Sequence, residues 1–324
     1  MHENPSRRGG RSRREQRRRR KARRRRMMWA VTTAAVLLGA SATYTAARLY
    51  SGRASAPTAR APQTAHAPRT TTESQPATSA PPVPMDLESA LSRVTALFSD
   101  NRMSVAILDT TSGESATYGE GAFDTASIVK VNILATLLLQ AQDTGRELTA
   151  QERAYAAAMI QNSDNDSTSA LWTEIGSATG LDAANERLGL SETTGGDGTV
   201  WGVTQTTARD QIRLLQAVFG DKSPLSTASR DYIQDLMYHI AASQDWGVTA
   251  AADAERPTAL KNGWLQRSQT KKWDVNSIGR IEKDGRVYFM AVLLNGCSTQ
   301  EAGIQIVEQA AVATVTAFAD TLTD

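Results

Sequence analysis

The sequence predicts a mixed α/β (α+β) domain in which both chain ends build one antiparallel sheet and the segment between them forms a helical lobe. Short runs of β-branched and apolar residues occur early in the domain and again near its end, whereas residues 127–242 have helical patterns. Five strands are expected, at residues 103–109, 114–118, 259–264, 275–282 and 286–294. Strands at both ends with helices between them favour this architecture.

Local signals support each element in turn. Residues 87–99 have the pattern of an opening helix. The first two strands are joined by residues 110–113, Thr-Thr-Ser-Gly, which are typical of a hairpin turn. The last two strands meet at Asp284-Gly285, a pair that favours a tight turn. Residues 300–322 predict the closing helix.

The charge is distributed unevenly along the 324 residues. Residues 1–26 carry 14 Lys and Arg and two acids, a net charge of +12, whereas the whole chain is +2. Residues 27–324 carry the difference, −10. No aromatic residue interrupts the arginines, and an uncharged segment follows directly. We therefore expect a basic cytoplasmic tail attracted to anionic lipid, and no nucleic-acid partner.

Residues 27–47 contain no charged residue. At ~1.5 Å per residue a helix of this length spans ~31 Å, about one bilayer core. The basic flank predicts that the N-terminus stays inside and the rest lies outside the cell membrane. We expect an uncleaved single-pass anchor; the alternative is a signal peptide cut after Ala40-Ser41-Ala42, which would release a secreted protein. Residues 48–84, rich in Ala, Thr, Pro and Ser, predict an extended linker to a folded domain at residues 85–324.

The scarcity of histidine and cysteine excludes two kinds of site. His239 is the only histidine of the domain, and Cys297 is the only cysteine of the chain. A zinc site needs three or four ligands, so we expect no metal and no cofactor. A Ser–His–Asp triad could use only His239, which lies in a helical stretch and is expected to be structural. Cys297 ends an apolar strand and is expected to be inert.

Ser127 and Lys130 form the pair that points most directly to chemistry. They stand at the start of the apolar run 131–139, which predicts a buried helix, so the lysine lies one turn from the serine on the same face. A serine hydroxyl needs an adjacent base, and a lysine can serve when burial or a neighbouring cation lowers its pKa. Taken alone, the pair also suits a helix-capping serine followed by a solvated lysine.

Two further motifs follow in order. Ser163-Asp164-Asn165 lies between the helical stretches 151–160 and 167–175, and alone would suit a helix–helix turn. Lys261-Asn262-Gly263 precedes Trp264, and alone would suit a strand end or a turn. Ser-x-x-Lys, Ser-Asp-Asn and Lys-Thr-Gly in this order form a known signature of penicillin-recognising enzymes.

With these motifs in order, residues 85–324 resemble the class A β-lactamase-like serine hydrolases. The context of each motif agrees: Ala126-Ser127-Ile128-Val129-Lys130-Val131 opens an apolar helix, and residues 156–162 lead into Ser163 in the family manner. The resemblance implies a β-lactamase/transpeptidase-like fold with the site between the sheet and an all-helical lobe. Two departures stand out. Asn262 replaces the family's Thr or Ser, and the connection from Ser127 to Ser163 is short.

The resemblance implies a role for each motif residue. Ser127 would attack a β-lactam or peptide carbonyl with Lys130 as base, and Ser163 would pass a proton to the leaving nitrogen. Lys261 would supply positive charge to Ser163 and to a substrate carboxylate. Asn165 would bind the substrate or brace Lys130. The remaining substrate-binding positions are Asn262, whose amide would donate to the carboxylate, Gly263, and Trp264, whose N–H would join that of Ser127 in the oxyanion hole.

Three functions stay open from the sequence: an efficient β-lactamase, a slow-deacylating hydrolase of cell-wall peptides, and a non-catalytic binding module. Class A enzymes carry a Glu-x-x-Leu-Asn pattern in the loop that corresponds to residues 191–205, and this pattern is missing here. Glu192 and Asp197 are its only carboxylates, and both are expected to be solvated. We therefore expect slow release of the acyl group. The substrate would be a small molecule or a cell-wall peptide, and the domain is expected to be monomeric.

Overall fold

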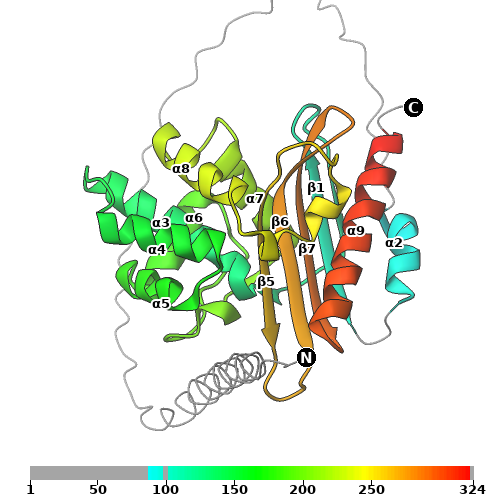
Figure 1. Cartoon of the computed structure of the whole chain (residues 1–324), viewed down its shortest axis with the longest axis horizontal. Coiled ribbons are helices and arrows are strands. Elements are labelled where there is room, and N and C mark those ends of the chain that lie inside the picture. Colours follow the sequence, from blue (N-terminus) through cyan, green and yellow to red (C-terminus); the bar gives the residue numbers. More distant parts are fainter. Residues whose placement is uncertain (1–86, 98–100, 322–324) are drawn as a thin grey trace, which may run out of the picture. The chain divides into compact units, whose positions relative to one another are not determined.

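The computed structural model describes residues 87–97 and 101–321, and its centre is a five-stranded antiparallel sheet of order β2-β1-β7-β6-β5 (Figure 1). The strands are β1 (Arg102–Asp109), β2 (Ser115–Tyr118), β5 (Ala259–Gln266), β6 (Trp273–Lys283) and β7 (Arg286–Cys297). Strand β1 pairs with β7, so the early hairpin and the late strands share one sheet. The predicted fold class is confirmed. The predicted tail, membrane segment and linker lie outside the described residues.

The hairpin between β6 and β7 shows how local sequence fixes the register. Lys283 pairs with Arg286, which leaves only Asp284 and Gly285 in the turn. Both adopt positive φ, 51° and 76°, as a two-residue turn of this type requires. The Asp-Gly pair tolerates this backbone conformation, so the predicted tight turn is confirmed.

Two helices, one at the start and one at the end of the described part of the chain, lie on one side of the sheet (Figure 1). Helix α9 (Gln300–Thr321) packs against β6 and β7, and α2 (Leu87–Thr95) packs against α9. Their apolar side chains form one buried cluster with Val105, Val292 and Leu294 of the sheet. Within the described ranges, α9 is also the one helix that is long and apolar enough to cross a membrane. Its packing on the sheet accounts for that composition.

The helical lobe lies on the other side of the sheet, next to β5 (Figure 1). Its helices are α3 (Val129–Asp143), α4 (Ala150–Gln161), α5 (Asn165–Glu174), α6 (Ser177–Leu188), α7 (Ala208–Phe219) and α8 (Thr227–Tyr238). Helix α3 is buried around most of its circumference, which explains why its sequence is apolar without a helical stripe. It forms the centre of the lobe.

Short elements connect the lobe to the sheet. The 3₁₀ turn η3 (Ala126–Ile128) precedes α3, and η4 (Trp201–Val203) lies in the loop between α6 and α7. Strands β3 (Phe123–Asp124) and β4 (Gln205–Thr206) pair with each other just before η3 and just after η4. This small ribbon brings the loop before α7 close to the start of α3.

Candidate active site

The side chains of two lysines contact the hydroxyl of one serine at the junction of the lobe and the sheet. The side-chain nitrogen of Lys130 lies 3.0 Å from Ser163 Oγ and 2.8 Å from the Ser163 carbonyl oxygen, and it donates to Asn165 Oδ1 at 2.9 Å. Lys261 Nζ lies 3.1 Å from the same Ser163 Oγ and donates to the Asn262 carbonyl at 2.8 Å. The structure thus brings together four residues that the three motifs predict.

The turn between α4 and α5 directs Ser163 toward the lysines. Asp164 caps α5 by accepting a hydrogen bond from the Ser167 amide at 2.8 Å, so the helix starts directly after Ser163. Ser163 itself adopts a left-handed conformation, with φ of 55°. A serine in this region is uncommon and costs about 1 kcal/mol or more, which is typical of functional turns.

Burial changes the protonation of both lysines. Burial lowers the pKa of Lys130 to about 7, although the charge of Asp164 acts in the opposite direction. Complete burial lowers the pKa of Lys261 well below its usual range, and the nearby Lys130 lowers it further. A substantial fraction of Lys130 is therefore neutral near pH 7, which is the form that accepts a proton. The sequence prediction that burial or a neighbouring cation would lower a lysine pKa agrees with this arrangement.

Ser127 lies in η3, immediately before α3, rather than in the first turn of that helix. Ser127 lines a cavity together with Asn165, which binds Lys130, but within the described ranges Lys130 hydrogen-bonds to Ser163 and Asn165 and not to Ser127. Contacts between a nucleophile and its base are often long before substrate binds. The preceding residue, Ala126, has a positive φ of 47°, so the backbone beside Ser127 is strained.

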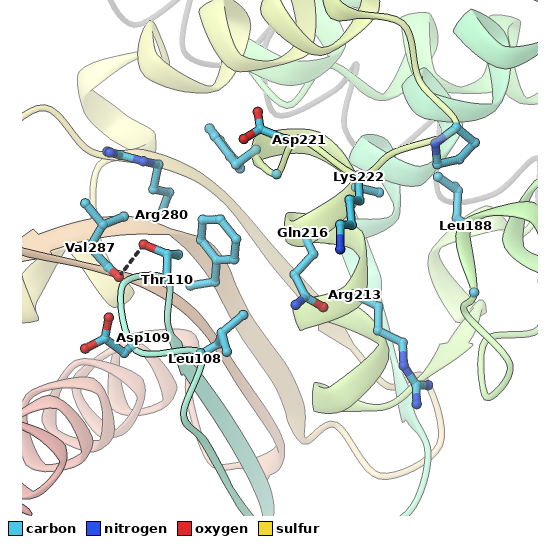
Figure 2. Close-up of a pocket in the computed structure, with 17 residues that line it drawn as sticks. Leu108, Asp109, Thr110, Leu188, Arg213, Gln216, Asp221, Lys222, Arg280 and Val287 are labelled. Carbon is cyan, nitrogen blue, oxygen red and sulfur yellow. Dashed lines mark hydrogen bonds between the residues drawn. The ribbon is translucent and has the colours of Figure 1, made fainter. Parts of the chain in front are cut away.

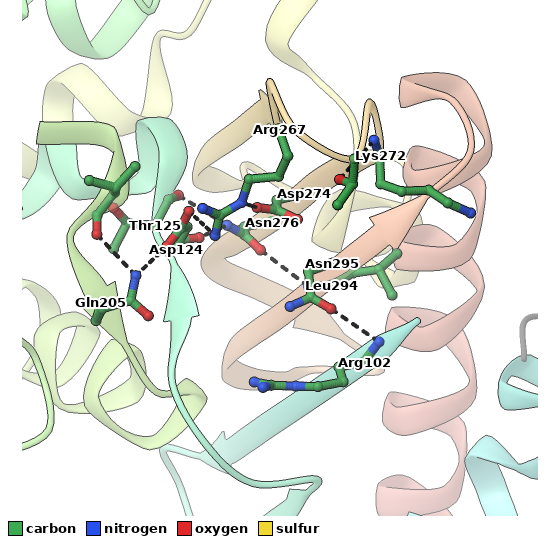
Figure 3. Close-up of polar contacts among 12 residues, drawn as sticks. Arg102, Asp124, Thr125, Gln205, Arg267, Lys272, Asp274, Asn276, Leu294 and Asn295 are labelled. Atoms are coloured by element: carbon green, nitrogen blue, oxygen red, sulfur yellow. Dashed lines mark hydrogen bonds and ion pairs between the residues drawn. The ribbon is translucent and has the colours of Figure 1, made fainter. Parts of the chain in front are cut away.

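A buried asparagine holds the strained turn from the sheet side (Figure 3). Asn276 of β6 is fully buried, and its amide donates to the carbonyls of Asp124 at 2.8 Å and Thr125 at 3.0 Å. Its Oδ1 accepts from the Leu294 amide on β7 at 3.2 Å. One side chain therefore ties two strands of the sheet to the two residues that precede Ala126.

An ion-pair network lies beside this asparagine (Figure 3). Arg267, just beyond β5, pairs with the buried carboxylates of Asp124 and Asp274, the second at 2.7 Å. Gln205 of β4 also donates to Asp124. Because these residues come from β3, β4 and the β5–β6 hairpin, the network fixes the chain just before η3. The sequence analysis assigned no role to any of them.

Strand β5 presents alternate residues to the site. A Cβ atom on Gly263 would lie 2.5 Å from the Ser127 nitrogen and 2.8 Å from the Ile128 nitrogen, so only glycine allows β5 to pack directly on η3. Lys261 shares this face, in keeping with the two-residue period of a strand. Gly263 therefore shapes the site through close backbone contact.

Asn262 and Trp264 belong to the opposite face of β5. The Asn262 amide donates to the carbonyls of Gln244 and Trp246, both at 2.8 Å, and Asn262 is 1% exposed. In this structure the amide therefore bonds to backbone carbonyls, because strand alternation turns the side chain away from the lysines; its donation to a substrate carboxylate stays a prediction. The Trp264 ring packs on Trp246 with centroids 5.9 Å apart, so Trp264 borders the site through its backbone.

Lys261 is buried on the face of β5 that meets Ser163. It is 1% exposed, and its side-chain nitrogen is committed to Ser163 and the Asn262 carbonyl. Contact with Ser163 agrees with the prediction. The predicted contact with a substrate carboxylate stays a prediction; in this structure the ammonium group is buried.

The loop before α7 places an indole ring, not a carboxylate, over Lys130. The Lys130 nitrogen lies 4.9 Å from the centroid of the Trp201 ring, and Trp201 Nε1 donates to Ser169 Oγ at 3.2 Å. Glu192 and Asp197 are both exposed, as expected. Glu192 lies near the start of this loop. It accepts a hydrogen bond from Thr207, which caps α7 just after the end of the loop. Sequence reasoning did not single out Trp201.

A cavity of about 300 Å³ opens beside Ser127, between the loop before α7 and β5. A larger cavity of about 800 Å³ lies elsewhere, bordered by Leu108 at the end of β1, Gln216 on α7 and Arg280 on β6 (Figure 2). None of the residues predicted for the site lines the larger cavity. We therefore assign the chemistry to the smaller one.

The remaining candidate groups carry no catalytic arrangement. Within residues 87–97 and 101–321, no three His, Cys, Asp or Glu side chains gather closely enough to hold a metal ion. His239 is at the end of α8, exposed and 3.2 Å from Asp235. Cys297 is buried, and burial raises the pKa of its thiol to about 11, so it stays protonated.

Comparison with known proteins places this arrangement in a family. A sequence model described as the Beta-lactamase enzyme family matches residues 145–318, more than half of the chain. The chain belongs to the Beta-lactamase enzyme family. The match to this family contains Ser163 and Lys261 and begins after Ser127 and Lys130.

Solved structures share the fold. A variant of the class A β-lactamase of the last common ancestor of Gram-negative bacteria is 22% identical with a TM-score of 0.60, covering 72% of this chain and 98% of that chain. A PBP-A mutant solved as an acyl-enzyme complex with penicillin G is 21% identical with a TM-score of 0.63, covering 75% and 100%. At this identity the likeness shows the fold alone.

Curated relatives match about half of the chain. The protein named "Putative lipoprotein LppW" of Mycobacterium tuberculosis is 28% identical over 171 residues, covering 50% of this chain and 54% of LppW. The same protein of Mycobacterium bovis matches equally. The chain thus spans about half the length of these relatives.

Proposed function

We propose that this protein is a serine hydrolase that forms an acyl-enzyme on Ser127 from a β-lactam or a related amide and releases the acyl group slowly. One observation carries the proposal. Lys130 and Lys261 both contact Ser163 Oγ, at 3.0 and 3.1 Å, and Lys130 also binds Asn165, which lines the same cavity as Ser127. This set contains a base with a lowered pKa and a hydroxyl that can relay a proton.

The chemistry follows from these contacts. Neutral Lys130 takes the proton from the Ser127 hydroxyl while Ser127 Oγ attacks the carbonyl carbon. The backbone N–H groups of Ser127 and Trp264 stabilise the negative charge on the carbonyl oxygen. Ser163 then delivers a proton to the leaving nitrogen, held in place by Lys261. Asn165 braces Lys130 through its Oδ1 and lies at the edge of the cavity.

Slow release is supported by the loop before α7. Hydrolysis of an acyl-enzyme needs a base for the attacking water, and a general base contributes typically ~10²–10⁴-fold. Trp201 covers Lys130 at the place where the loop approaches it, and both loop carboxylates are exposed. This favours a slow-deacylating penicillin-binding hydrolase over an efficient β-lactamase. The intact lysine–serine cluster speaks against a non-catalytic module.

Burst kinetics with a chromogenic cephalosporin test the proposal. The purified protein should release about one equivalent of product per active site and then turn over slowly. Ser127→Ala should show no burst, and Cys297→Ser should keep it, because the thiol is buried and protonated. Steady turnover without a burst would contradict slow release, and a burst retained in Ser127→Ala would contradict the assigned nucleophile.

We also propose that the domain lies outside the membrane, tethered by residues 27–47. The lipoprotein relatives support an association with the cell envelope. Protease added to intact cells should degrade the domain and spare residues 1–26. A protected domain would contradict the orientation, and a soluble form beginning near Thr43 would favour the cleaved signal.

A further inference from the structure

The larger cavity, of about 800 Å³, lies between the sheet and α7, and Ser127 does not line it (Figure 2). Its volume is within the range of ~300–1,000 Å³ that is typical of sites for small ligands. Figure 2 shows Thr110 and Arg280 on the sheet side, and Gln216 and Lys222 on the side of α7 and the loop that follows it. Two separate parts of the fold therefore border a volume that a small molecule can fill.

The sheet side is an apolar surface that ends in an arginine. Phe289 of β7 pairs with Leu108 of β1 and with Arg280 of β6, so these side chains form one row on the same face of the sheet. Leu108 and Phe289 belong to the same core as the helices of the lobe. Val287, two residues before Phe289, shares this face and is half-buried. Arg280 therefore places a positive charge at the edge of an apolar surface.

Helix α7 and the loop after it supply the second side. Phe219, the last residue of α7, has its ring centroid 5.8 Å from that of Phe289, so an aromatic contact joins the two sides. Gln216 is exposed one turn earlier, and its side chain makes no hydrogen bond to the described part of the chain. Lys222 is exposed in the loop. These groups combine apolar surface with free donors, which suits a ligand that buries an apolar body and presents one polar group.

Two of the five charged side chains that line the cavity, Lys222 and Arg280, have no hydrogen bond or ion pair within the described ranges. Each of the other three is balanced by a residue of opposite charge. These ion pairs are Asp109–Arg286 at 2.6 Å, Arg213–Asp210 at 2.7 Å and Asp221–Arg230 at 3.7 Å. The cavity therefore has an excess of positive charge, which favours a negatively charged ligand.

The C-terminal end of α7, which carries partial negative charge, is compensated by hydrogen bonds. The carbonyl of Ala217 accepts from Ser223 Oγ at 2.6 Å. The carbonyl of Val218 accepts from Gln234 Nε2 at 2.8 Å. These donors satisfy carbonyl groups that would otherwise repel an anion. The two unpaired cations therefore dominate the charge of the cavity.

From the unpaired Arg280 and Lys222 and the apolar surface beside them, we propose that this cavity binds an organic carboxylate with an apolar body. The guanidinium of Arg280 donates to the carboxylate, in the bidentate geometry that arginine favours. The apolar body lies against the half-buried Phe219 and Val287. Lys222 contributes less, because it is exposed. This site goes beyond the proposed function and is independent of the acyl-enzyme chemistry.

Isothermal titration calorimetry of the purified full-length protein tests the site with three probes. 4-Phenylbutyrate has a carboxylate and an aromatic body, 4-phenylbutanamide has the same shape without the charge, and butyrate lacks the ring. 4-Phenylbutyrate should bind at least about tenfold more tightly than the amide, because hydrogen bonds between charged groups are stronger. It should also bind at least about tenfold more tightly than butyrate, because the ring becomes buried.

Three variants connect this binding to the cavity. Arg280→Gln should weaken binding of 4-phenylbutyrate about tenfold and leave binding of the amide nearly unchanged. Arg153→Gln is the matched control, since it removes an arginine of α4 that is 46% exposed and does not line the cavity. Gln216→Trp should weaken binding of both the acid and the amide at least about fivefold, because the larger side chain occupies the cavity.

The same measurements can overturn the site. Equal affinities for 4-phenylbutyrate and 4-phenylbutanamide would refute the preference for a carboxylate. An affinity for 4-phenylbutyrate that is unchanged in both Arg280→Gln and Gln216→Trp would place the anion elsewhere on the protein, and the absence of saturable binding would refute the site itself. Gln216 is exposed on α7, so Gln216→Trp tests the cavity even where Arg280→Gln disturbs the sheet.

Discussion

The side-chain nitrogen of Lys130 lies 4.9 Å from the centre of the Trp201 ring, within the range of a cation–π contact. The indole covers the lysine on the side of the loop before α7. A carboxylate there would hold Lys130 in its charged form and would bind a water molecule. The indole ring stabilises the charged lysine less than a carboxylate would, and it does not hold a water molecule in the same way. The same contact therefore relates to both halves of the proposed chemistry: it leaves Lys130 able to act as a base, and it provides no base for deacylation.

Acylation should depend on pH through Lys130. The neutral amine is the active form, and burial lowers its pKa to about 7. The acylation rate should therefore fall about tenfold per pH unit below 7 and level off above it. Stopped-flow measurement of the burst between pH 5 and 9 checks this. Lys130→Arg stays charged throughout and should be slow at every pH; a flat wild-type profile would argue against Lys130 as the base.

Replacing Trp201 by glutamate should speed release of the acyl group. Trp201→Glu places a carboxylate beside Lys130 where it can activate water, so deacylation should rise at least about tenfold. The steady-state rate after the burst measures it. Trp201→Gln is the matched control, since it opens the same space without a base. Equal acceleration in both variants would mean that access of water, not a missing base, limits release.

Asn276 should position the nucleophile. Asn276→Ala removes the donor to the Asp124 and Thr125 carbonyls and should lower the free energy of unfolding by about 1–3 kcal/mol. It should also slow acylation, with the pH midpoint unchanged. The control is Asn295→Ala, which removes one hydrogen bond to the Arg102 amide and none to the carbonyls of Asp124 and Thr125. Denaturant unfolding and burst kinetics should separate them; normal acylation in Asn276→Ala would leave Asn276 a purely structural role.

Gly263 should be required for the oxyanion hole. In Gly263→Ala the new methyl group would lie 2.5 Å from the Ser127 nitrogen, so β5 must move away from η3. Losing alignment of one oxyanion donor typically costs ~10²–10³ in turnover. We expect acylation to fall by at least about 10²-fold while the domain still unfolds cooperatively. A folded variant with a wild-type rate would exclude this close approach from catalysis.

The sequence predicted the sheet and the start of the buried helix α3 because their signals are local. The Asp284-Gly285 turn depends on backbone conformation at two residues, and Ser127 and Lys130 lie in one continuous apolar segment. The three motifs also had a known order, which made the meeting of Lys130, Ser163 and Lys261 predictable although they are far apart in the chain.

The supporting residues were not predictable in the same way. Asn276 is one polar residue within a buried strand, and its partners Asp124 and Thr125 lie about 150 positions earlier. Trp201 lies in a glycine-containing loop without periodicity, where composition does not indicate which way a side chain points. The direction of Asn262 was not predictable from the motif, because a motif names residue types, whereas the alternation of β5 decides which way each side chain points.

Mass spectrometry of the protein after incubation with penicillin G tests the central claim most directly. The intact mass should increase by one penicillin per chain and persist for many minutes, and peptide mapping should place the adduct on Ser127. Ser127→Ala should remain unmodified under the same conditions. An adduct on another residue, or equal labelling of Ser127→Ala, would contradict the account.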